Sequence, residues 1–356
     1  MRRISAIDLF CGVGGLTHGL RLSGINVTAG VDIDKTCEFA YSQNNQGAAF
    51  IAKDLKNLSS DELAEMYPND TIKILAGCAP CQPFSALNIA GKKGNTSELD
   101  ERWSLLGEFG TKIEELQPDI VSMENVPQLT KHKIYHEFVS LLKKNGYFVE
   151  AKIVNCADYG VPQRRKRLVL LASKHGKISL IPATHIGTHV SIKDIIAELP
   201  TIEHGEICET DVLHAAPKLS PINEKRIIAS KQGGTWKSWD DDLKLDCHKK
   251  LTGESYIDSY GRMSWNLPAP TLTTKCTGIG NGRFGHPEQN RTISLREAAL
   301  LQSFPKDYLF IPKDTQKIPF TQISRHIGNA VPVLLGKVIG ESIIKHLNEL
   351  HNEPKI

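Results

Sequence analysis

The stretch ISAIDLFCGVGGLTHGLRLSGINVTAGVD, residues 4–32, indicates how the first part of this chain folds. A short apolar run enters a glycine-rich turn, a helical segment follows, and a second apolar run ends at Asp32. Glycines in such a turn let the backbone approach a ligand closely, and the N-terminus of the following helix is electropositive. The turn lacks a G-x-G-x-x-G pattern, so it does not by itself specify a dinucleotide. The unit predicts a sheet with a ligand site at the carboxyl ends of its strands.

Alternating strands and helices of this kind continue as far as residue 173. The alternation indicates a mostly parallel sheet with helices on both faces, which is a Rossmann-like, doubly wound α/β fold. Ser59 and Glu62 form a capping-box pattern at the start of one helix. The expected strands are 4–10, 25–32, 48–54, 71–77, 119–125, 147–155 and 167–173, and the expected helices are 14–24, 34–44, 60–67, 102–118 and 134–146.

Residues 185–290 have a different composition from the segments on either side. They are rich in Gly, Ser, Thr, His and Asn, their helical periodicity is weak, and they hold three of the four tryptophans. We expect a second, smaller domain here that is irregular and β-rich. Helical patterns return at 294–305 and at 328–350, the latter as a C-terminal helix.

The composition limits the class of protein. The 356 residues are 40% hydrophobic and 23% charged, and no apolar run approaches the ~20 residues that cross a bilayer, so no membrane partner is expected. The eight cysteines are scattered, which favours a cytoplasmic location over a secreted disulfide framework. A net charge of +3 does not by itself indicate a nucleic-acid partner, and the sharpest basic cluster is QRRKR, residues 163–167.

The segment GCAPCQPFSAL, residues 77–87, follows the fourth expected strand and contains two cysteines. A redox pair usually has its second cysteine inside a helix, and Pro83 opposes a long helix directly after Cys81. A zinc site needs a second ligand pair, and none has matching spacing, so no metal is expected. Pro80 and Pro83 restrict the residues before them. The pattern therefore favours Cys81 as a lone nucleophile and gives Cys78 a structural role.

A carboxyl group and two guanidinium groups are expected near the same edge of the sheet. Glu124 ends the fifth expected strand, where it is placed to act as a general acid. The QRRKR cluster supplies Arg165 and Arg167 before another strand. A cysteine, a carboxyl group and an arginine at successive strand ends suit a nucleophile that adds to an electron-poor ring.

Six segments follow one another along the chain, namely DLFCGVGG, GCAPCQPFS, ENV, QRRKR, REAALLQSFP and GNAVP. In this order, and over nearly the whole length, the chain resembles the cytosine-C5 DNA methyltransferases of the bacterial, S-adenosylmethionine-dependent type. The resemblance implies a class I methyltransferase sheet with a target recognition domain. It implies a catalytic domain at 1–184, a recognition domain at 185–317 that includes REAALLQSFP, and a segment, 318–356, that returns to the catalytic domain.

The resemblance also implies roles for the predicted catalytic residues. Cys81 would add as a thiolate to C6 of a cytosine that has left the duplex. Glu124 would hydrogen-bond the N3 edge, so that C5 becomes nucleophilic, and Arg165 and Arg167 would lie near O2 and the cysteine. The methyl group would come from S-adenosylmethionine. The implied cofactor residues are Phe10, Gly12, Gly14, Gly15, Asp32, Ile33, Asp54, Pro80 and Asn329.

The recognition segment offers fewer assignments. The pair Thr271–Leu272 matches a dipeptide of Thr and an aliphatic residue that such domains carry. Arg283 is a candidate for a base or phosphate contact, because arginine suits guanine in direct readout. Gln82 and Ser85, beside the nucleophile, complete the expected DNA-binding residues. The DNA sequence that is methylated is not legible from these residues.

Three other functions compete with DNA methylation. A tRNA methyltransferase of the same family would carry Cys-Phe-Thr, where this chain has KCTGIG, residues 275–280. A DNA-binding protein with a silent catalytic domain is disfavoured by the intact Cys81 and Glu124. A nicotinamide-dependent oxidoreductase would explain the sheet but not Pro80-Cys81-Gln82. The partners expected are double-stranded DNA and a cognate restriction endonuclease, with the chain acting as a monomer.

Overall fold

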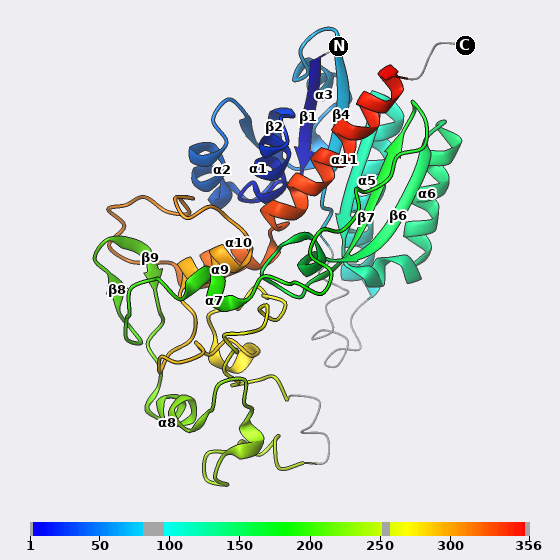
Figure 1. The fold of residues 1–356 in the computed structure, drawn as a ribbon. Coiled ribbons are helices and arrows are strands. Elements are labelled where there is room, and N and C mark those ends of the chain that lie inside the picture. Colours follow the sequence, from blue (N-terminus) through cyan, green and yellow to red (C-terminus); the bar gives the residue numbers. More distant parts are fainter. Residues whose placement is uncertain (1–2, 81–95, 251–256, 353–356) are drawn as a thin grey trace. The chain divides into compact units, whose positions relative to one another are not determined.

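The computed structural model describes residues 3–80, 96–250 and 257–352, and the chain divides into two compact units (Figure 1). The units differ from the expected domains, because the segment Ala157–Arg165 and the residues up to Ala330 belong to the second unit. The first unit comprises Met1–Cys156, Lys166–Ala183 and Val331–Ile356, and the second comprises Ala157–Arg165 and Thr184–Ala330.

The first unit contains a seven-stranded sheet in the order β3-β2-β1-β4-β5-β7-β6. All neighbouring pairs are parallel except those that β7 makes with β5 and β6, so the expected mostly parallel sheet is confirmed. The strand order changes direction between β1 and β4, where open α/β sheets bind ligands. The strands are β1 Arg3–Leu9, β2 Asn26–Asp32, β3 Ala49–Ala52, β4 Thr71–Gly77, β5 Ile120–Asn125, β6 Phe148–Asn155 and β7 Lys166–Ser173.

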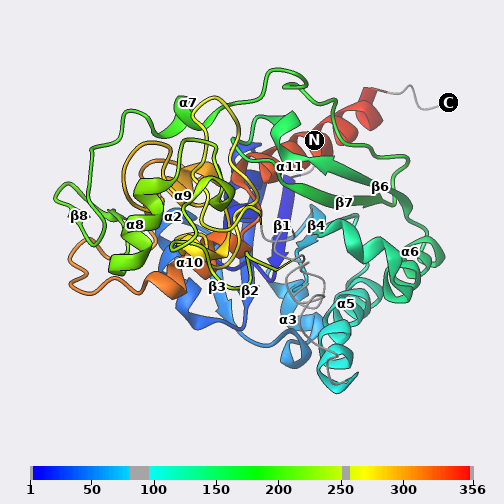
Figure 2. The same ribbon diagram turned by 90° about the horizontal axis from the view of Figure 1, so that it is seen from below.

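Helices cover both faces of this sheet. Figure 2 shows α11 on one side of the sheet and α3, α5 and α6 on the other. On the first side α1 crosses α11 at glycines, because a Cβ on Gly19 would lie 2.4 Å from the carbonyl oxygen of Val333. The helices of this unit are α1 Gly15–Leu22, α2 Glu38–Asn44, α3 Ser60–Glu65, α5 Thr96–Leu116, α6 Lys133–Lys144 and α11 Val333–Asn352.

Strand β5 passes through the centre of the core, and all six of its residues are buried. Strands of a parallel sheet covered on both faces read as continuous apolar runs for this reason. The two polar residues at the end of this strand, Glu124 and Asn125, are therefore buried as well. Buried polar groups need hydrogen-bond partners, so their surroundings determine what they can do.

Two of the expected helix boundaries differ most from the structure. The C-terminal helix expected over 328–350 is interrupted, since α10 ends at Asn329, Ala330 is extended, and α11 begins at Val333. Pro332 explains the break, because proline lacks an N–H and disfavours helical geometry in the preceding residue. Helix α5 begins at Thr96 rather than at residue 102, in a stretch whose residues are too polar to show an apolar stripe.

The stretch Phe320–Leu350 contains an 18-residue window that is apolar enough to cross a membrane by composition, with a mean hydropathy of 1.4. However, 67% of its most apolar window is buried within the protein. Burial of that extent is typical of a core helix in a globular protein.

The second unit has less regular structure. Within its described residues the sheet content is one two-stranded ribbon, so the expected β-rich character is not confirmed. Isolated bridges such as Arg262 with Gly285 connect other loops. Its named elements are α7 Ile192–Ile196, β8 Ile207–Cys208, β9 Asp211–Ala215, α8 Pro221–Ala229, α9 Leu295–Leu301 and α10 Phe320–Asn329.

In the second unit, hydrogen bonds from a buried arginine side chain, rather than from neighbouring strands, satisfy several carbonyl groups of the irregular loops. The guanidinium of Arg262 donates to the carbonyl oxygens of Ile227, Ser230, His286 and Gln289. Arginine offers five N–H donors in a fixed planar arrangement, so one side chain can hold several loops. An alternating strand pattern is therefore not needed to satisfy these carbonyl groups.

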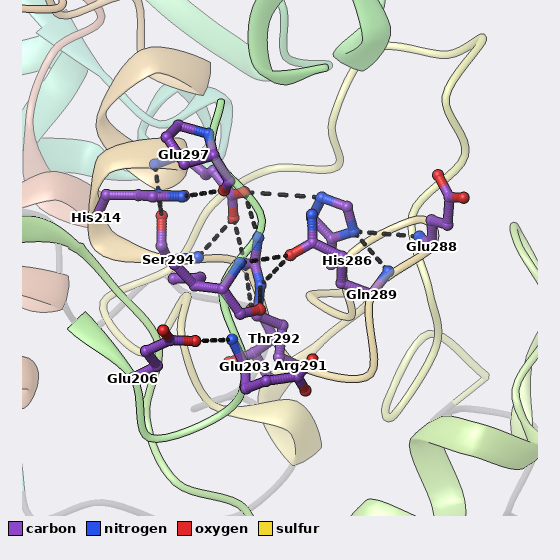
Figure 3. Close-up of polar contacts among 12 residues, drawn as sticks. Glu203, Glu206, His214, His286, Glu288, Gln289, Arg291, Thr292, Ser294 and Glu297 are labelled. Carbon is purple, nitrogen blue, oxygen red and sulfur yellow. Dashed lines mark hydrogen bonds and ion pairs between the residues drawn. The ribbon is translucent and has the colours of Figure 1, made fainter. Parts of the chain in front are cut away.

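A buried ion pair fixes the start of α9 (Figure 3). Nη1 and Nη2 of Arg291 each donate to the carboxylate of Glu297 at 2.7 Å, and both side chains are almost fully buried. Burial opposes the charged carboxylate, but the hydrogen bonds and charge of Arg291 outweigh it and lower the pKa of Glu297. Ser294 and Glu297 also form the capping box of this helix, and His214 contacts the Ser294 hydroxyl at 2.9 Å.

Candidate active site

The turn after β1 has the geometry of a ligand-binding loop. Phe10, Gly12 and Gly14 have φ values of 60°, 51° and 88°, in the left-handed region. A Cβ on Gly12 would meet no heavy atom within 4 Å, so its backbone borders open space within the first unit. Gly15 is the first residue of α1, whose N–H groups at this end have no partner within the helix.

Asp32 ties the ends of β1 and β2 together. Its Oδ2 accepts from the Gly12 N–H and its Oδ1 from the Asp34 N–H, both at 2.8 Å. Burial raises the pKa of Asp32, against the effect of these hydrogen bonds. Ile33 is 68% exposed directly beside it. An acid and an exposed apolar side chain at one strand end can contact a sugar hydroxyl and a flat ring.

Asp54 has a local role at the end of β3. Its Oδ1 accepts from the Lys56 N–H at 3.0 Å and caps a short 3₁₀ turn, Leu55–Asn57. The side chain is half-buried. This is the turn-capping contact common for aspartate after a strand, and it leaves one carboxylate oxygen for another donor.

Asp8 is a buried acid whose contacts the sequence did not reveal. It is fully buried near the end of β1, and the Thr17 hydroxyl donates to its Oδ2 at 2.7 Å. Burial raises the pKa of Asp8 to about 7. The available signal was an aspartate inside an otherwise apolar strand, since such a residue needs a buried partner.

Glu124 is held from two sides at the end of β5. Its Oε1 lies 2.8 Å from Nε of Arg167, and its Oε2 accepts from Sγ of Cys78 at 2.8 Å. The antiparallel pairing of β5 with β7 brings Arg167 to this position. Glu124 lies opposite Val169, and Arg167 is two residues from Val169 along β7, so its side chain is on the same face of the sheet. Thus two of the predicted catalytic residues, Glu124 and Arg167, are in contact, and Cys78 joins them.

The end of β4 is fixed to both neighbouring strands. The Cys78 N–H donates to the Leu9 carbonyl at 3.3 Å, and the Asn125 side chain donates to the Ala79 carbonyl at 3.1 Å. Pro80 is exposed. Cys81, Gln82 and Ser85 lie outside the described residues, so the predicted nucleophile follows directly after this anchored segment.

Arg165 belongs to the second unit, whereas Arg167 belongs to the first. It is buried, and its guanidinium donates to the carbonyl oxygens of Leu272 at 2.9 Å and Gly328 at 3.0 Å. These contacts tie three separate chain segments together within the second unit.

The remaining predicted residues of the second unit have varied surroundings. Thr271 is exposed and donates to the Arg164 carbonyl, whereas Leu272 is buried. Asn329 is exposed at the end of α10. Arg283 makes four hydrogen bonds, to Asp258 and to the carbonyls of Gly233 and Gly234.

The sheet order, the glycine turn beside an acid and the buried carboxylate at the end of β5 define a methyltransferase of the class I fold. Residues 4–345 match the C-5 cytosine-specific DNA methylase family, and the chain belongs to that family. It is therefore a DNA (cytosine-5-)-methyltransferase.

Similar proteins agree with this assignment. The chain is 50% identical to the Type II methylase M.HgiDII of Herpetosiphon aurantiacus, over 99% of this chain and 98% of the relative. It is 31% identical to the Type II methyltransferase M1.HphI of Haemophilus parahaemolyticus, over 96% and 87%. The fold is similar to that of a chain described as a prophage-encoded DNA modification methyltransferase from E. coli, with a TM-score of 0.73, 23% identity, and coverage of 97% and 99%.

Proposed function

We propose that the chain methylates C5 of a flipped cytosine within one specific duplex DNA sequence, through a covalent bond between Cys81 and C6. The observation that carries this proposal is the buried Glu124, with Arg167 at one carboxylate oxygen and Cys78 at the other. Such a fixed carboxylate can hold the N3 edge of one cytosine in one orientation. A stacked cytosine is inaccessible from above and below its ring, so the base must leave the helix first.

Cys81, Glu124 and Arg167 each have a separate role in the proposed reaction. The Cys81 thiolate adds to C6 while Glu124 holds a proton at N3, so negative charge does not build up on the ring. C5 is then nucleophilic. Loss of the C5 proton and expulsion of the Cys81 thiolate afterwards restore the aromatic ring. Arg167 keeps the Glu124 carboxylate oriented through its ion pair.

The first unit fits S-adenosylmethionine as the methyl donor. Open space at Gly12 and the start of α1 suits the methionine part, Asp32 the ribose hydroxyls, and the exposed Ile33 the adenine ring. When bound, the cofactor supplies an electrophilic methyl group to C5. Further contacts are proposed for Phe10, Gly14, Gly15, Asp54, Pro80 and Asn329.

We assign target recognition to the second unit and a restriction–modification role to the protein. Two relatives are named as Type II enzymes, which favours a cognate endonuclease acting at the same site. We further propose that the protein acts as a monomer in the cytoplasm. The residues proposed to contact DNA, or to hold the loops that do so, are Gln82, Ser85, Thr271 and Arg283. The side chain of Leu272 is buried, so this residue would contribute through its backbone.

Incubation with methyl-labelled S-adenosylmethionine and either duplex DNA or tRNA tests this function. We expect label on cytosine C5 at one duplex sequence, and sequencing the product identifies that site. Duplex containing 5-fluorocytosine should trap a covalent complex with wild type but not with Cys81→Ser, because fluorine blocks the final elimination. Label on tRNA alone, or no trapped complex, would refute the proposal.

A further inference from the structure

The thiol of Cys78 occupies an unexpected position beside the catalytic carboxylate. Its Sγ lies 2.8 Å from Oε2 of Glu124, while Nε of Arg167 lies 2.8 Å from Oε1. The two carboxylate oxygens therefore have different neighbours, one a thiol and the other a guanidinium. Glu124 is 3% exposed, so water contributes little to its orientation.

The backbone that carries the Cys78 thiol is anchored on both sides. The Cys78 N–H donates to Leu9 at the end of β1, and the next residue, Ala79, accepts from Asn125 at the end of β5. Asn125 follows Glu124 directly and Ala79 follows Cys78 directly. The hydrogen bond between Asn125 and Ala79 therefore links the backbone beside the carboxylate to the backbone beside the thiol. With the backbone anchored in this way, rotation about χ1 is the main remaining freedom of the thiol, and in the observed rotamer it contacts Oε2.

We propose that Cys78 is a positioning residue for Glu124 that selects the orientation in which the carboxylate meets the cytosine. This inference rests on the proposed role of Glu124 at the N3 edge. A carboxylate oxygen has two lone pairs, so Oε2 can accept the Cys78 S–H and still contact the base. Without the thiol, the Arg167 ion pair is the restraint that remains among the described residues, and the carboxylate can rotate about its last bond.

The effect should be on the chemical step rather than on binding. Cys78→Ala removes the donor, and we expect kcat to fall on the order of tenfold, because a hydrogen bond to a charged group is lost. The KM for DNA should stay the same, since Cys78 contributes through Glu124. Cys78→Ser keeps a donor and should retain most of the wild-type kcat.

Cys208→Ala is a matched control, because this half-exposed thiol contacts the Thr210 hydroxyl rather than a carboxylate. It should leave kcat unchanged. A double-mutant cycle adds a test of mechanism: in a Glu124→Gln background, Cys78→Ala should have little further effect, because both changes act on the same group. Thermal denaturation and circular dichroism of each variant establish that it is folded.

The possible results separate this inference from the function on which it rests. Wild-type kcat in folded Cys78→Ala, or full additivity with Glu124→Gln, overturns the positioning role. Should Cys78→Ala fail to fold, Cys78→Ser decides instead, and a tenfold loss in the folded serine variant counts against it. Absence of a trapped complex between wild type and 5-fluorocytosine DNA defeats the proposed function, whatever Cys78 does.

Discussion

Arg283 and Asp258 form an ion pair in which both Nε and Nη2 of the arginine donate to the same carboxylate oxygen, at 3.0 and 2.8 Å. The remaining guanidinium nitrogen donates to the carbonyls of Gly233 and Gly234. The arginine thus joins two loops of the second unit. A bidentate contact with guanine would require some of these hydrogen bonds to break.

We therefore expect Arg283→Ala to affect every position of the DNA site to a similar extent. The loop containing Lys231 and Gln232, both exposed, would lose its attachment, and binding should weaken without one position becoming permissive. Methylation of a randomised duplex library, followed by sequencing, measures this directly. Asp258→Asn is the control, because it should reproduce the effect. Relaxation at one position in Arg283→Ala, with a normal Asp258→Asn enzyme, would show that Arg283 reads a base.

The buried pair of Arg291 and Glu297 should be important for stability. Glu297→Gln leaves a buried guanidinium without its counter-charge, and breaking a buried pair in this way costs about 3–5 kcal/mol. We expect a lower thermal midpoint and faster proteolysis within the second unit. Glu288→Gln, at an exposed position on a nearby loop, should change neither. Equal midpoints for Glu297→Gln and wild type would contradict the expectation.

How far the sequence predicts the structure depends on the kind of signal. The first unit is predictable because strands such as β7 contain a continuous apolar run and its turns carry glycine. The break at Pro332 was missed because the apolar periodicity continues across it. The β-rich character expected of the second unit is not confirmed, because side chains such as Arg262 satisfy its loops and no periodic pattern reports such contacts.

Some residues of the candidate site could be predicted from the sequence, and one contact could not. Glu124 was predicted from its place at a strand end, and its neighbour Arg167 from a basic cluster. The contact between Cys78 and Glu124 depends on the register of β4 with β5, and residues 46 apart in the chain meet only once that register exists. Spacing along the sequence carries no such information, so the sequence predicts only a structural role for Cys78.

Asp8 should make stability depend on pH. Its pKa in the folded protein is about 7, above the ordinary 3.8, because burial disfavours the charged form. Between about pH 4 and pH 7 the folded state therefore holds a proton that the unfolded state has lost, and stability falls as the pH rises. Above pH 7 the carboxyl group is charged in both states, and its contribution no longer changes.

Asp8→Asn should remove this dependence. The thermal midpoint of the variant minus that of wild type should be more positive at pH 8 than at pH 5. This holds whether the variant is more or less stable than wild type at pH 5. Thermal denaturation at the two pH values measures the difference. Ser122→Ala, a buried and non-ionisable change in β5, should show an offset that does not depend on pH. A constant offset for Asp8→Asn as well would mean that Asp8 titrates normally.

Alanine substitutions at Gly12 and Gly24 can separate the effect of backbone strain on stability from an effect on ligand binding. Both have positive φ, 51° and 91°, and a Cβ on either would meet no heavy atom within 4 Å. Alanine at each should cost about 1 kcal/mol of stability, because the left-handed region disfavours a side chain. Only Gly12 lies in the turn before α1, where a ligand would approach the backbone. We expect Gly12→Ala to weaken S-adenosylmethionine binding by tenfold or more, and Gly24→Ala to leave it unchanged, as measured by isothermal titration calorimetry. Equal affinities for the two variants would show that the cofactor does not approach Gly12.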